Sequence, residues 1–358
     1  MWDSDTEAEP DPPDWSKNVP DEVLKQLSPR EKKRQEIINE LFHTERTHVR
    51  GLKVLDQVFY RPIREQLVLP PDQLELLFAN LEEMLIIHSQ FNNLMKAKRK
   101  ESPIVGDIGM LLQFFFVQFE GEAFQKAAVS FCARQQIALD ALKEKRKKEP
   151  KLHNFLTEAE MNPVCRRLQL KDIIPTGWIR LTKYPLLLEN LSKHTPSECE
   201  EFTNLQWAIE RSKEILSHVN KAVKEAQDEH RLAEIQRRLD RSQFDKVDHP
   251  MATEFRNIDL TKHRLIHEGC LNWRIANRPK LIDLHVLLLE DVIVLLQKQD
   301  EKYVLKFYNP TLSPVIKVST VLVRPNAVDK KALFLVNTSQ NGAQIYDLVT
   351  PSYAEKRM

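Results

Sequence analysis

The stretch IPTGWIRLTKYPLLLENL, residues 174–191, places apolar residues at helical spacing around one glycine and two prolines. Its apolar face consists of Leu181, Tyr184, Leu187, Leu188 and Leu191. This spacing predicts a core helix. Arg180 and Lys183 fall on a side away from that face, so we expect both cations to be exposed. Pro185 is expected to bend the helix or free a carbonyl. The segment is either a kinked core helix with solvated charges or a surface for a partner.

Comparable stripes occur on both sides of this segment. An early stripe consists of Ile38, Leu41, Val49, Leu52 and Leu55. A later, longer stripe consists of Ile215, Val219, Val223, Ala226, Leu232, Ile235 and Leu239. Long amphipathic repeats with little glycine favour an elongated helical bundle. We therefore predict an all-α domain over residues 29–240.

The period changes from about His263. HVLLLEDVIVLLQKQ contains two apolar runs around Glu290 and Asp291, which indicates a β-hairpin. Further short apolar runs follow, separated by Pro, Asn, Asp and Gly turns. This pattern predicts a small antiparallel barrel or sandwich over 241–358, joined to the bundle near RSQFDKVDHP. The fold class is therefore α+β with two domains.

Residues 1–28 are rich in proline and begin acidic, which indicates a disordered or weakly ordered lead. Trp15 is unusual in such a segment. An aromatic side chain there either docks onto a partner or folds back on its own domain.

Composition excludes several classes of function. A net charge of +1 argues against a nucleic-acid-binding protein. No apolar run has membrane-spanning length and no signal peptide is recognisable, so we expect a cytoplasmic protein. The four cysteines form no CxxC pair, and the seven glycines form no phosphate-binding loop. No catalytic triad can be assembled, and we expect no metal and no cofactor.

Three sets of residues are candidates for binding a partner. Glu40, in INELFHTERTHV, is off the apolar stripe and is either an acceptor for a partner or an ordinary exposed glutamate. Arg166 and Arg167, in CRRLQLKDII, would diverge by about 100° on a helix, so at least one would face solvent. Strand alternation puts Phe334 and Val336 on one face of ALFLVNTS. That face is either buried or, on an edge strand, an apolar patch.

Two runs, KAKRKES and KEKRKKEPK, are strongly basic. They permit binding to a membrane or nucleic acid, but no interleaved aromatic residue supports base stacking. Solvation of helix ends is the favoured interpretation.

Several of these motifs occur in the same order in a known family. ELFHTERTHV, RLTKYPLLLENL and the β domain behind them resemble the Dbl-homology/pleckstrin-homology (DH-PH) tandem of Rho guanine-nucleotide exchange factors. CRRLQLKDIIPT, IHEG and VLLLEDVIVLLQKQDE are most similar to the RGS-containing RhoGEFs. The resemblance extends from about Asp14 to the C-terminus.

The resemblance implies a guanine-nucleotide exchange factor for RhoA-like small GTPases, which performs no covalent chemistry. Such a protein binds the nucleotide-free GTPase better than the GDP-bound form. It also implies a cytoplasmic protein recruited to the plasma membrane, with a weak membrane contact through the PH domain.

The resemblance also assigns roles to single residues. Glu40 matches a glutamate that grips switch I, Lys183 a lysine that faces switch II, and Asn220 an asparagine at the same surface. Trp15 matches a tryptophan that touches the GTPase. The remaining GTPase-binding positions that the resemblance assigns are Arg166, Arg167, Ile179, Arg180, Phe334 and Val336.

The chain departs from the family pattern at two places. Gly177-Trp178-Ile179-Arg180 stands where EMQR is usual, so Ile179 replaces an amide that contacts the GTPase. The loss of one such hydrogen bond removes about 0.5–1.5 kcal/mol. The chain also stops at SYAEKRM, where the closing helix of a PH domain would begin, so we expect a PH domain without that helix.

Two alternatives to exchange activity follow from these departures. One is a DH-PH module that binds a GTPase or membrane without driving exchange, which Ile179 makes conceivable. The other is a lipid-binding adaptor that acts through Arg274, Arg278 and Lys280, although these cations form no dense cluster.

Overall fold

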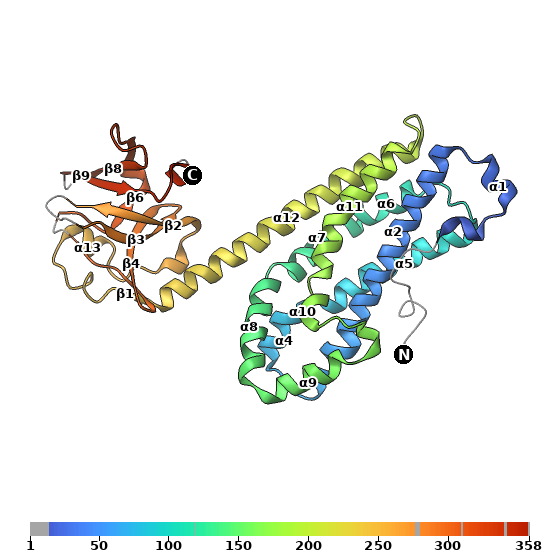
Figure 1. Cartoon of the computed structure of the whole chain (residues 1–358), viewed down its shortest axis with the longest axis horizontal. Helices are drawn as coiled ribbons and strands as arrows, with labels where there is room; N and C mark the ends of the chain where they lie inside the picture. The colour runs from blue at the N-terminus through green and yellow to red at the C-terminus, as the bar shows by residue number, and fades with distance from the viewer. Residues whose placement is uncertain (1–13, 118, 276–279, 309–310, 340–341, 357–358) are drawn as a thin grey trace. The chain divides into compact units, whose positions relative to one another are not determined.

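The computed structural model describes residues 14–356, except 118, 276–279, 309–310 and 340–341. The chain divides into two compact units, Met1–Ala226 and Gln227–Met358. The first is helical and the second contains the sheet (Figure 1), which confirms the α+β class. The division lies inside a long helix rather than at residue 240, because Leu232 and Ile235 pack into the core of the second unit.

The first unit contains a series of helices that begins with the short 3₁₀ helix η1 (Trp15–Asn18). The others are α1 (Asp21–Gln26), α2 (Pro29–Val54), the π-helical η2 (Leu55–Tyr60), α3 (Arg61–Glu65), α4 (Pro71–Phe78), α5 (Leu81–Glu101), α6 (Gly109–Phe116), α7 (Phe119–Cys132), α8 (Gln135–Lys148), α9 (Pro150–Glu160), η3 (Pro163–Cys165), α10 (Leu170–Ile173), α11 (Thr176–Lys193) and α12 (Glu200–Arg237). The last of these continues into the second unit.

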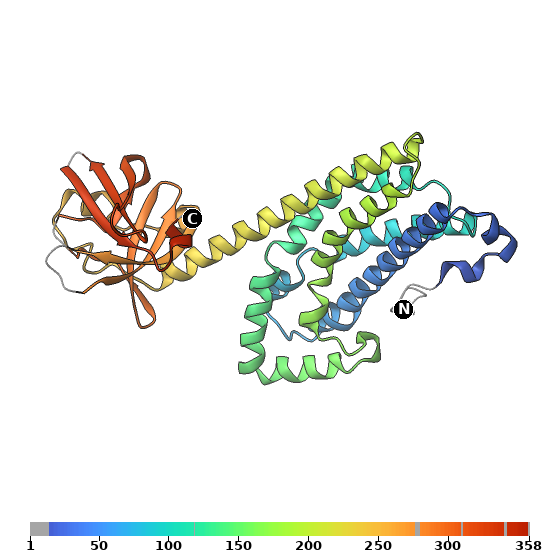
Figure 2. The same cartoon turned by 45° about the horizontal axis from the view of Figure 1, so that its top comes forward.

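Helix α2 forms the centre of the first unit. Ser28 caps it by accepting a hydrogen bond from the Glu31 backbone N–H, and Pro29 occupies the first helical position. The helix packs against α5 and α11, and Figure 2 shows α2 and α11 side by side. The buried side of α2 therefore positions α11 relative to its neighbours.

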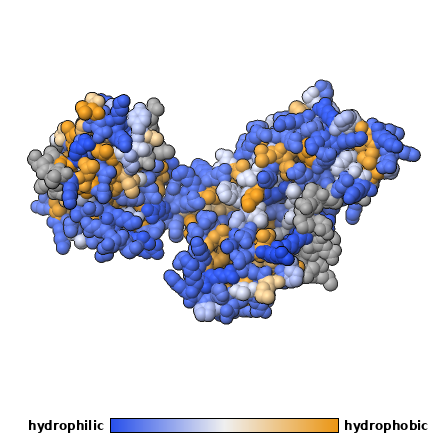
Figure 3. Space-filling view, viewed as in Figure 1, coloured by the Kyte–Doolittle hydropathy of each residue, from blue (hydrophilic) through white to orange (hydrophobic). Residues whose placement is uncertain are grey.

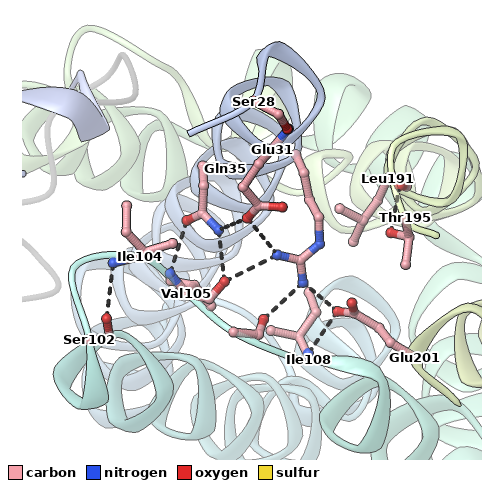
Figure 4. Close-up of polar contacts among 12 residues, drawn as sticks. Ser28, Glu31, Gln35, Ser102, Ile104, Val105, Ile108, Leu191, Thr195 and Glu201 are labelled. Atoms are coloured by element: carbon pink, nitrogen blue, oxygen red, sulfur yellow. Dashed lines mark hydrogen bonds and ion pairs between the residues drawn. The ribbon is translucent and has the colours of Figure 1, made fainter. Parts of the chain in front are cut away.

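A buried polar cluster holds the N-terminal half of α2 in place (Figure 4). The Arg34 guanidinium forms an ion pair with Glu201 at 2.6 Å, with both side chains about 6–7% exposed. Gln35 exchanges hydrogen bonds with the backbone of Val105, and Glu201 also accepts the Ile108 N–H. These contacts join α2 to the loop before α6 and to the start of α12, so their polar groups are satisfied although they are buried.

The core around α11 is aromatic. Tyr184 packs among Phe116 and Phe124, with ring centroids 5.2 and 6.4 Å away. Gly177, in the first turn, has Phe131 directly against it, since a Cβ at this position would lie 2.8 Å from Phe131 Cε1. The glycine therefore lets the start of α11 approach α7, which outweighs its low helix propensity.

The second unit is built on a mixed sheet. Its strands are β1 (Leu239–Asp240), β2 (Leu265–Arg274), β3 (Ile282–Leu289), β4 (Val292–Gln299), β5 (Lys302–Val304), β6 (Val315–Lys317), β7 (Val321–Pro325), β8 (Ala332–Ser339) and β9 (Gly342–Val349). Their order is β1-β5-β4-β3-β2-β9-β8-β7, with β6 also paired to β4. The predicted hairpin is confirmed as β3 and β4. Among the described strands, β1 and β7 stay unpaired with each other, so the sheet is open rather than a closed barrel.

Two cores cover the sheet. One contains Leu232 and Ile235 of α12 with Phe244 and Leu287, and the other surrounds Trp273. Short helices complete the unit. They are α13 (Pro250–Glu254), η4 (Leu260–Lys262), η5 (Val318–Thr320) and α14 (Tyr353–Lys356). The last of these is a single turn at the end of the described chain.

Candidate functional site

A groove of about 340 Å³ runs between α2 and α11. From α2 it is lined by Glu40, Thr44, Thr47, His48, Arg50, Gly51 and Val54, and from α11 by Thr176, Ile179, Arg180, Lys183 and Leu187. Glu40 and Lys183 are both exposed. The structure thus brings a carboxylate and an ammonium group, 143 positions apart in the sequence, to one apolar groove.

The α11 side of the groove follows helical spacing. Ile179, Lys183 and Leu187 are four residues apart and therefore lie on one face of the helix. Ile179 is 51% exposed, so it offers apolar surface at the position where the resemblance expects an amide. Leu187, predicted in the core face, is only partly buried and borders the groove. Pro185 is buried inside α11, which continues through it.

Asn220 of α12 lies beside the same helix. The Trp178 indole Nε1–H donates a hydrogen bond to Asn220 Oδ1 at 3.2 Å, and both side chains are exposed. Three residues were predicted to act in nucleotide exchange. They come from three helices of one unit, Glu40 from α2, Lys183 from α11 and Asn220 from α12. The sequence assigned no role to Trp178, and no sequence pattern indicated its hydrogen bond to Asn220 of α12.

Arg180 was predicted to be exposed beside Lys183, and this prediction is wrong, whereas its predicted contact with a GTPase stays a prediction. The residue is 5% exposed. Its guanidinium binds the Glu45 carboxylate at 2.8–2.9 Å, donates to Thr44 Oγ1 and lies over the Tyr184 ring at 4.3 Å. The hydrogen bonds between the guanidinium and the buried carboxylate replace those that both groups lose to water. Arg180 therefore joins α11 to α2 underneath the groove.

Glu45 is the centre of this buried network. It is fully buried and also accepts hydrogen bonds from Tyr184 Oη at 2.6 Å and His88 Nδ1 at 2.7 Å. Burial opposes the charged carboxylate, but Arg180 and His88 outweigh that effect and hold the pKa of Glu45 well below its usual range. The sequence offered no signal for this role, because a glutamate in a charged helical segment looks like a surface residue.

His48 makes the stability of this unit depend on pH. Burial, and next the adjacent His88, lower the pKa of His48 well below its ordinary value of 6.5. Below about pH 6.5 His48 is protonated in the unfolded chain but stays neutral in the folded chain. The free energy of unfolding is therefore highest above that pH and falls on acidification. We expect the free energy of unfolding to fall by about 1.4 kcal/mol per pH unit from this residue alone.

Urea denaturation at about pH 7 and about pH 5.5 tests this prediction. His48→Gln should reduce the difference between the two conditions. His218→Gln, at an exposed position of α12, is the matched control and should leave the difference unchanged. An equal pH dependence in wild type and His48→Gln would contradict the assignment.

Arg166 and Arg167 lie in a turn and not on a helix. Both have positive φ angles, of 51° and 66°, directly after η3. Arg167 is exposed and Arg166 partly buried. Their neighbours Cys165 and Leu168 line the groove, so the basic pair lies at its rim.

Trp15 is partly buried in η1, which packs against α2. Asp14 caps this short helix by accepting a hydrogen bond from the Ser16 N–H. The structure therefore favours the interpretation in which Trp15 folds back on its own domain, and it still leaves part of the ring exposed. The first thirteen residues of the acidic lead lie outside the described residues.

Phe334 and Val336 lie on β8, between β7 and β9, rather than on an edge strand. Leu335 points into the core, whereas Phe334 and Val336 are partly exposed. Leu322 of β7 and Ile345 of β9 lie directly opposite Val336 and are 48% and 57% exposed. We call Phe334, Val336, Leu322 and Ile345 the sheet patch. Figure 3 shows apolar surface over the part of this unit where Figure 1 places β8 and β9.

Of the cations proposed for lipid binding, the structure describes Arg274 and Lys280, and Arg274 is not free. Arg274 pairs with Asp329 at 3.2 Å and Asp347 at 3.1 Å. Lys280 is exposed, and Arg278 lies outside the described residues. Since two carboxylates already neutralise Arg274, it is poorly suited to hold a phosphate.

The basic run at the end of α8 is largely paired with its own unit. Arg146 binds Glu160, Lys147 binds Glu144, and Lys151 donates to the carbonyls of residues 66 and 67. These contacts favour the interpretation of a helix end over that of a binding surface. Across the part of the chain that the structure describes, no group of three or more His, Cys, Asp or Glu side chains could hold a metal ion. Within the same residues, no helix has the length and apolarity needed to cross a membrane.

Comparison with known protein families gives two matches. Residues 37–220 match the RhoGEF domain, and residues 249–358 match a PH domain. The chain is 49% identical to Rho guanine nucleotide exchange factor 12 of Mus musculus over 98% of its length, and 45% identical to Rho guanine nucleotide exchange factor 11 of Homo sapiens over 99%. It spans only about a quarter of each of these relatives, 24% in both.

Solved structures show the same fold. The DH/PH domains of PDZ-RhoGEF, in complex with GTP-γ-S-activated RhoA, match with a TM-score of 0.92 and 46% identity over 96% of both chains. The DH/PH domains of p115-RhoGEF match with a TM-score of 0.90 and 42% identity, over 98% of this chain and 97% of that one.

Proposed function

The chain belongs to the RhoGEF domain family and carries a PH domain behind the RhoGEF domain, and we propose that it accelerates GDP release from RhoA-type GTPases. The observation that carries this proposal is the surface on which Glu40 and Lys183 share one groove and Asn220 lies alongside. Relatives with 42–46% identity adopt the same fold, and one is solved in complex with activated RhoA.

The mechanism that we propose requires no covalent step. Glu40 would engage switch I, and Lys183 and Asn220 would engage switch II. The groove and Ile179 would take apolar side chains of the partner. Because these contacts favour the nucleotide-free GTPase, binding weakens the hold on GDP and Mg²⁺, and GTP then refills the site.

Release of fluorescent GDP from RhoA, Rac and Cdc42, with and without the protein, tests this function. We expect acceleration on RhoA. If none of the three GTPases releases GDP faster, the exchange function is refuted.

The second candidate is a module that binds a GTPase without driving exchange. It is favoured by the exposed Ile179, which cannot donate or accept the hydrogen bond of an amide. Stable binding to nucleotide-free RhoA, together with unchanged GDP release, would identify this case.

We also propose that the sheet patch binds GTP-loaded RhoA. Phe334→Ala is expected to weaken this binding about tenfold, because the only aromatic side chain of the patch, which is partly exposed, would be lost. Exchange in solution should stay largely intact, since Phe334 belongs to the second unit and the groove to the first. Pull-down or calorimetry with GTP-γ-S-loaded RhoA measures the effect.

Val328→Ala is the control for the patch. Val328 is a 94% exposed apolar residue outside it, and its removal should not change the affinity. Equal binding by wild type and Phe334→Ala would contradict the assignment.

Recruitment from the cytoplasm to the plasma membrane is proposed through the PH domain. Because Arg274 is already paired, we expect the contact with anionic lipid to be weak. Co-sedimentation with vesicles that contain or lack anionic lipid measures it.

A further inference from the structure

The first turn of α11 carries an exposed indole for which the mechanism above has no use. Trp178 is 41% exposed, although tryptophan is among the residues most costly to leave in water. Its only polar atom, Nε1, donates to Asn220 Oδ1 at 3.2 Å. Because the two residues belong to different helices, this hydrogen bond joins α11 to α12 at the solvent-facing surface.

The chemistry of this bond determines how the Asn220 carboxamide is turned. An indole N–H can only donate, and an amide nitrogen cannot accept. The oxygen of Asn220 must therefore face Trp178, and the NH₂ group is left pointing away from it. Among the residues that the structure describes, none accepts a hydrogen bond from this NH₂ group, so its two N–H bonds are available to a partner.

The backbone contact at Gly177 places Trp178. Phe131 of α7 lies directly against Gly177, where a Cβ would come within 2.8 Å of the ring. The start of α11 therefore packs directly against α7, and this contact fixes the position of the next residue, Trp178. A bulky side chain with only two rotatable bonds loses little entropy when it is held, which suits it to hold a neighbour in one orientation.

We propose that Trp178 is a positioning residue that orients Asn220 so that its amide N–H groups meet an oxygen acceptor on the GTPase. The inference rests on the proposed exchange function and adds a residue to it. Without the indole N–H, the carboxamide would rotate freely, and its donors would face the acceptor only part of the time.

Trp178→Phe tests this role, because it keeps an aromatic ring and removes the donor. We expect kcat/KM for GDP release from RhoA to fall about two- to tenfold, the loss corresponding to one neutral hydrogen bond. In an Asn220→Ala background the same substitution should have no further effect, since the group that it orients is absent. Equal losses in both backgrounds, or no loss in the wild-type background, would overturn the proposal.

Asn220→Asp separates orientation from donation. The carboxylate still accepts the indole N–H but has no N–H to offer, so this variant should lose at least as much activity as Asn220→Ala. Exchange at the wild-type rate by Asn220→Asp would show that the amide donors are not used.

Trp207→Phe is the matched control. Trp207 is a 59% exposed tryptophan of α12 that lies outside the groove, and its indole makes no hydrogen bond with the described residues. Trp207→Phe should therefore exchange at the wild-type rate. Urea denaturation of Trp178→Phe should give the wild-type midpoint, and a large shift would assign the residue a structural role instead.

Absence of exchange by the wild-type protein refutes the proposed function, whereas normal exchange by Trp178→Phe refutes only this inference.

Discussion

Glu40→Ala is expected to lower kcat/KM for GDP release from RhoA by about ten- to a hundredfold. Glu40 is an exposed carboxylate at the edge of an apolar groove, where a hydrogen bond to a charged group contributes about 1.5–3 kcal/mol. Lys183→Ala, on the opposite side of the groove, is expected to have a loss of similar size. Stopped-flow or plate-reader release of fluorescent GDP measures both.

Each variant has a matched control on its own helix. Glu36 lies one turn before Glu40 on α2 and pairs with Lys33 at the surface, so Glu36→Ala should exchange at the wild-type rate. Lys193, exposed at the end of α11, serves in the same way for Lys183. Wild-type rates for Glu40→Ala and Lys183→Ala would refute the roles assigned to these two residues.

Arg180→Met is expected to have the largest effect on stability. The substitution leaves the Glu45 carboxylate fully buried without its cation, a change that costs about 3–5 kcal/mol. Thermal or urea denaturation should therefore show a clear loss in the midpoint of the first unit's unfolding.

A second variant distinguishes the charge from the packing. Removing both charges, as in Glu45→Gln with Arg180→Met, should restore part of the loss, because no uncompensated charge then remains in the core. Lys33→Met breaks a solvent-exposed pair on α2 and should change the midpoint little. If Arg180→Met behaves like Lys33→Met, the buried pair is not important for stability.

The sequence predicted the helical region, the change of period near His263 and the hairpin of β3 and β4 because these depend on local patterns. Apolar spacing of 3.6 or 2 residues decides which face of an element is buried, and this is visible in one segment at a time. The ion pairs on Glu45 were not visible, since they join α2, α5 and α11 across large sequence separations. Spacing placed Arg180 with Lys183, although one is buried and the other exposed.

The turn at Arg166 and Arg167 shows the same limit. Neither position is a glycine, yet both residues adopt positive φ angles, which residues with a Cβ adopt only rarely. The boundary between the units also depends on packing, because α12 is one continuous helix whose last turns belong to the core of the sheet unit.

By itself, the sequence determined the fold class, the order of the two domains and the candidates Glu40, Lys183 and Asn220, the last three through a family resemblance. Only the tertiary structure placed Glu40 and Lys183 on one groove, buried Arg180 beneath it and joined Trp178 to Asn220. The physical reason is that periodicity reports which side of a helix faces the core, whereas partners across helices depend on how the helices pack.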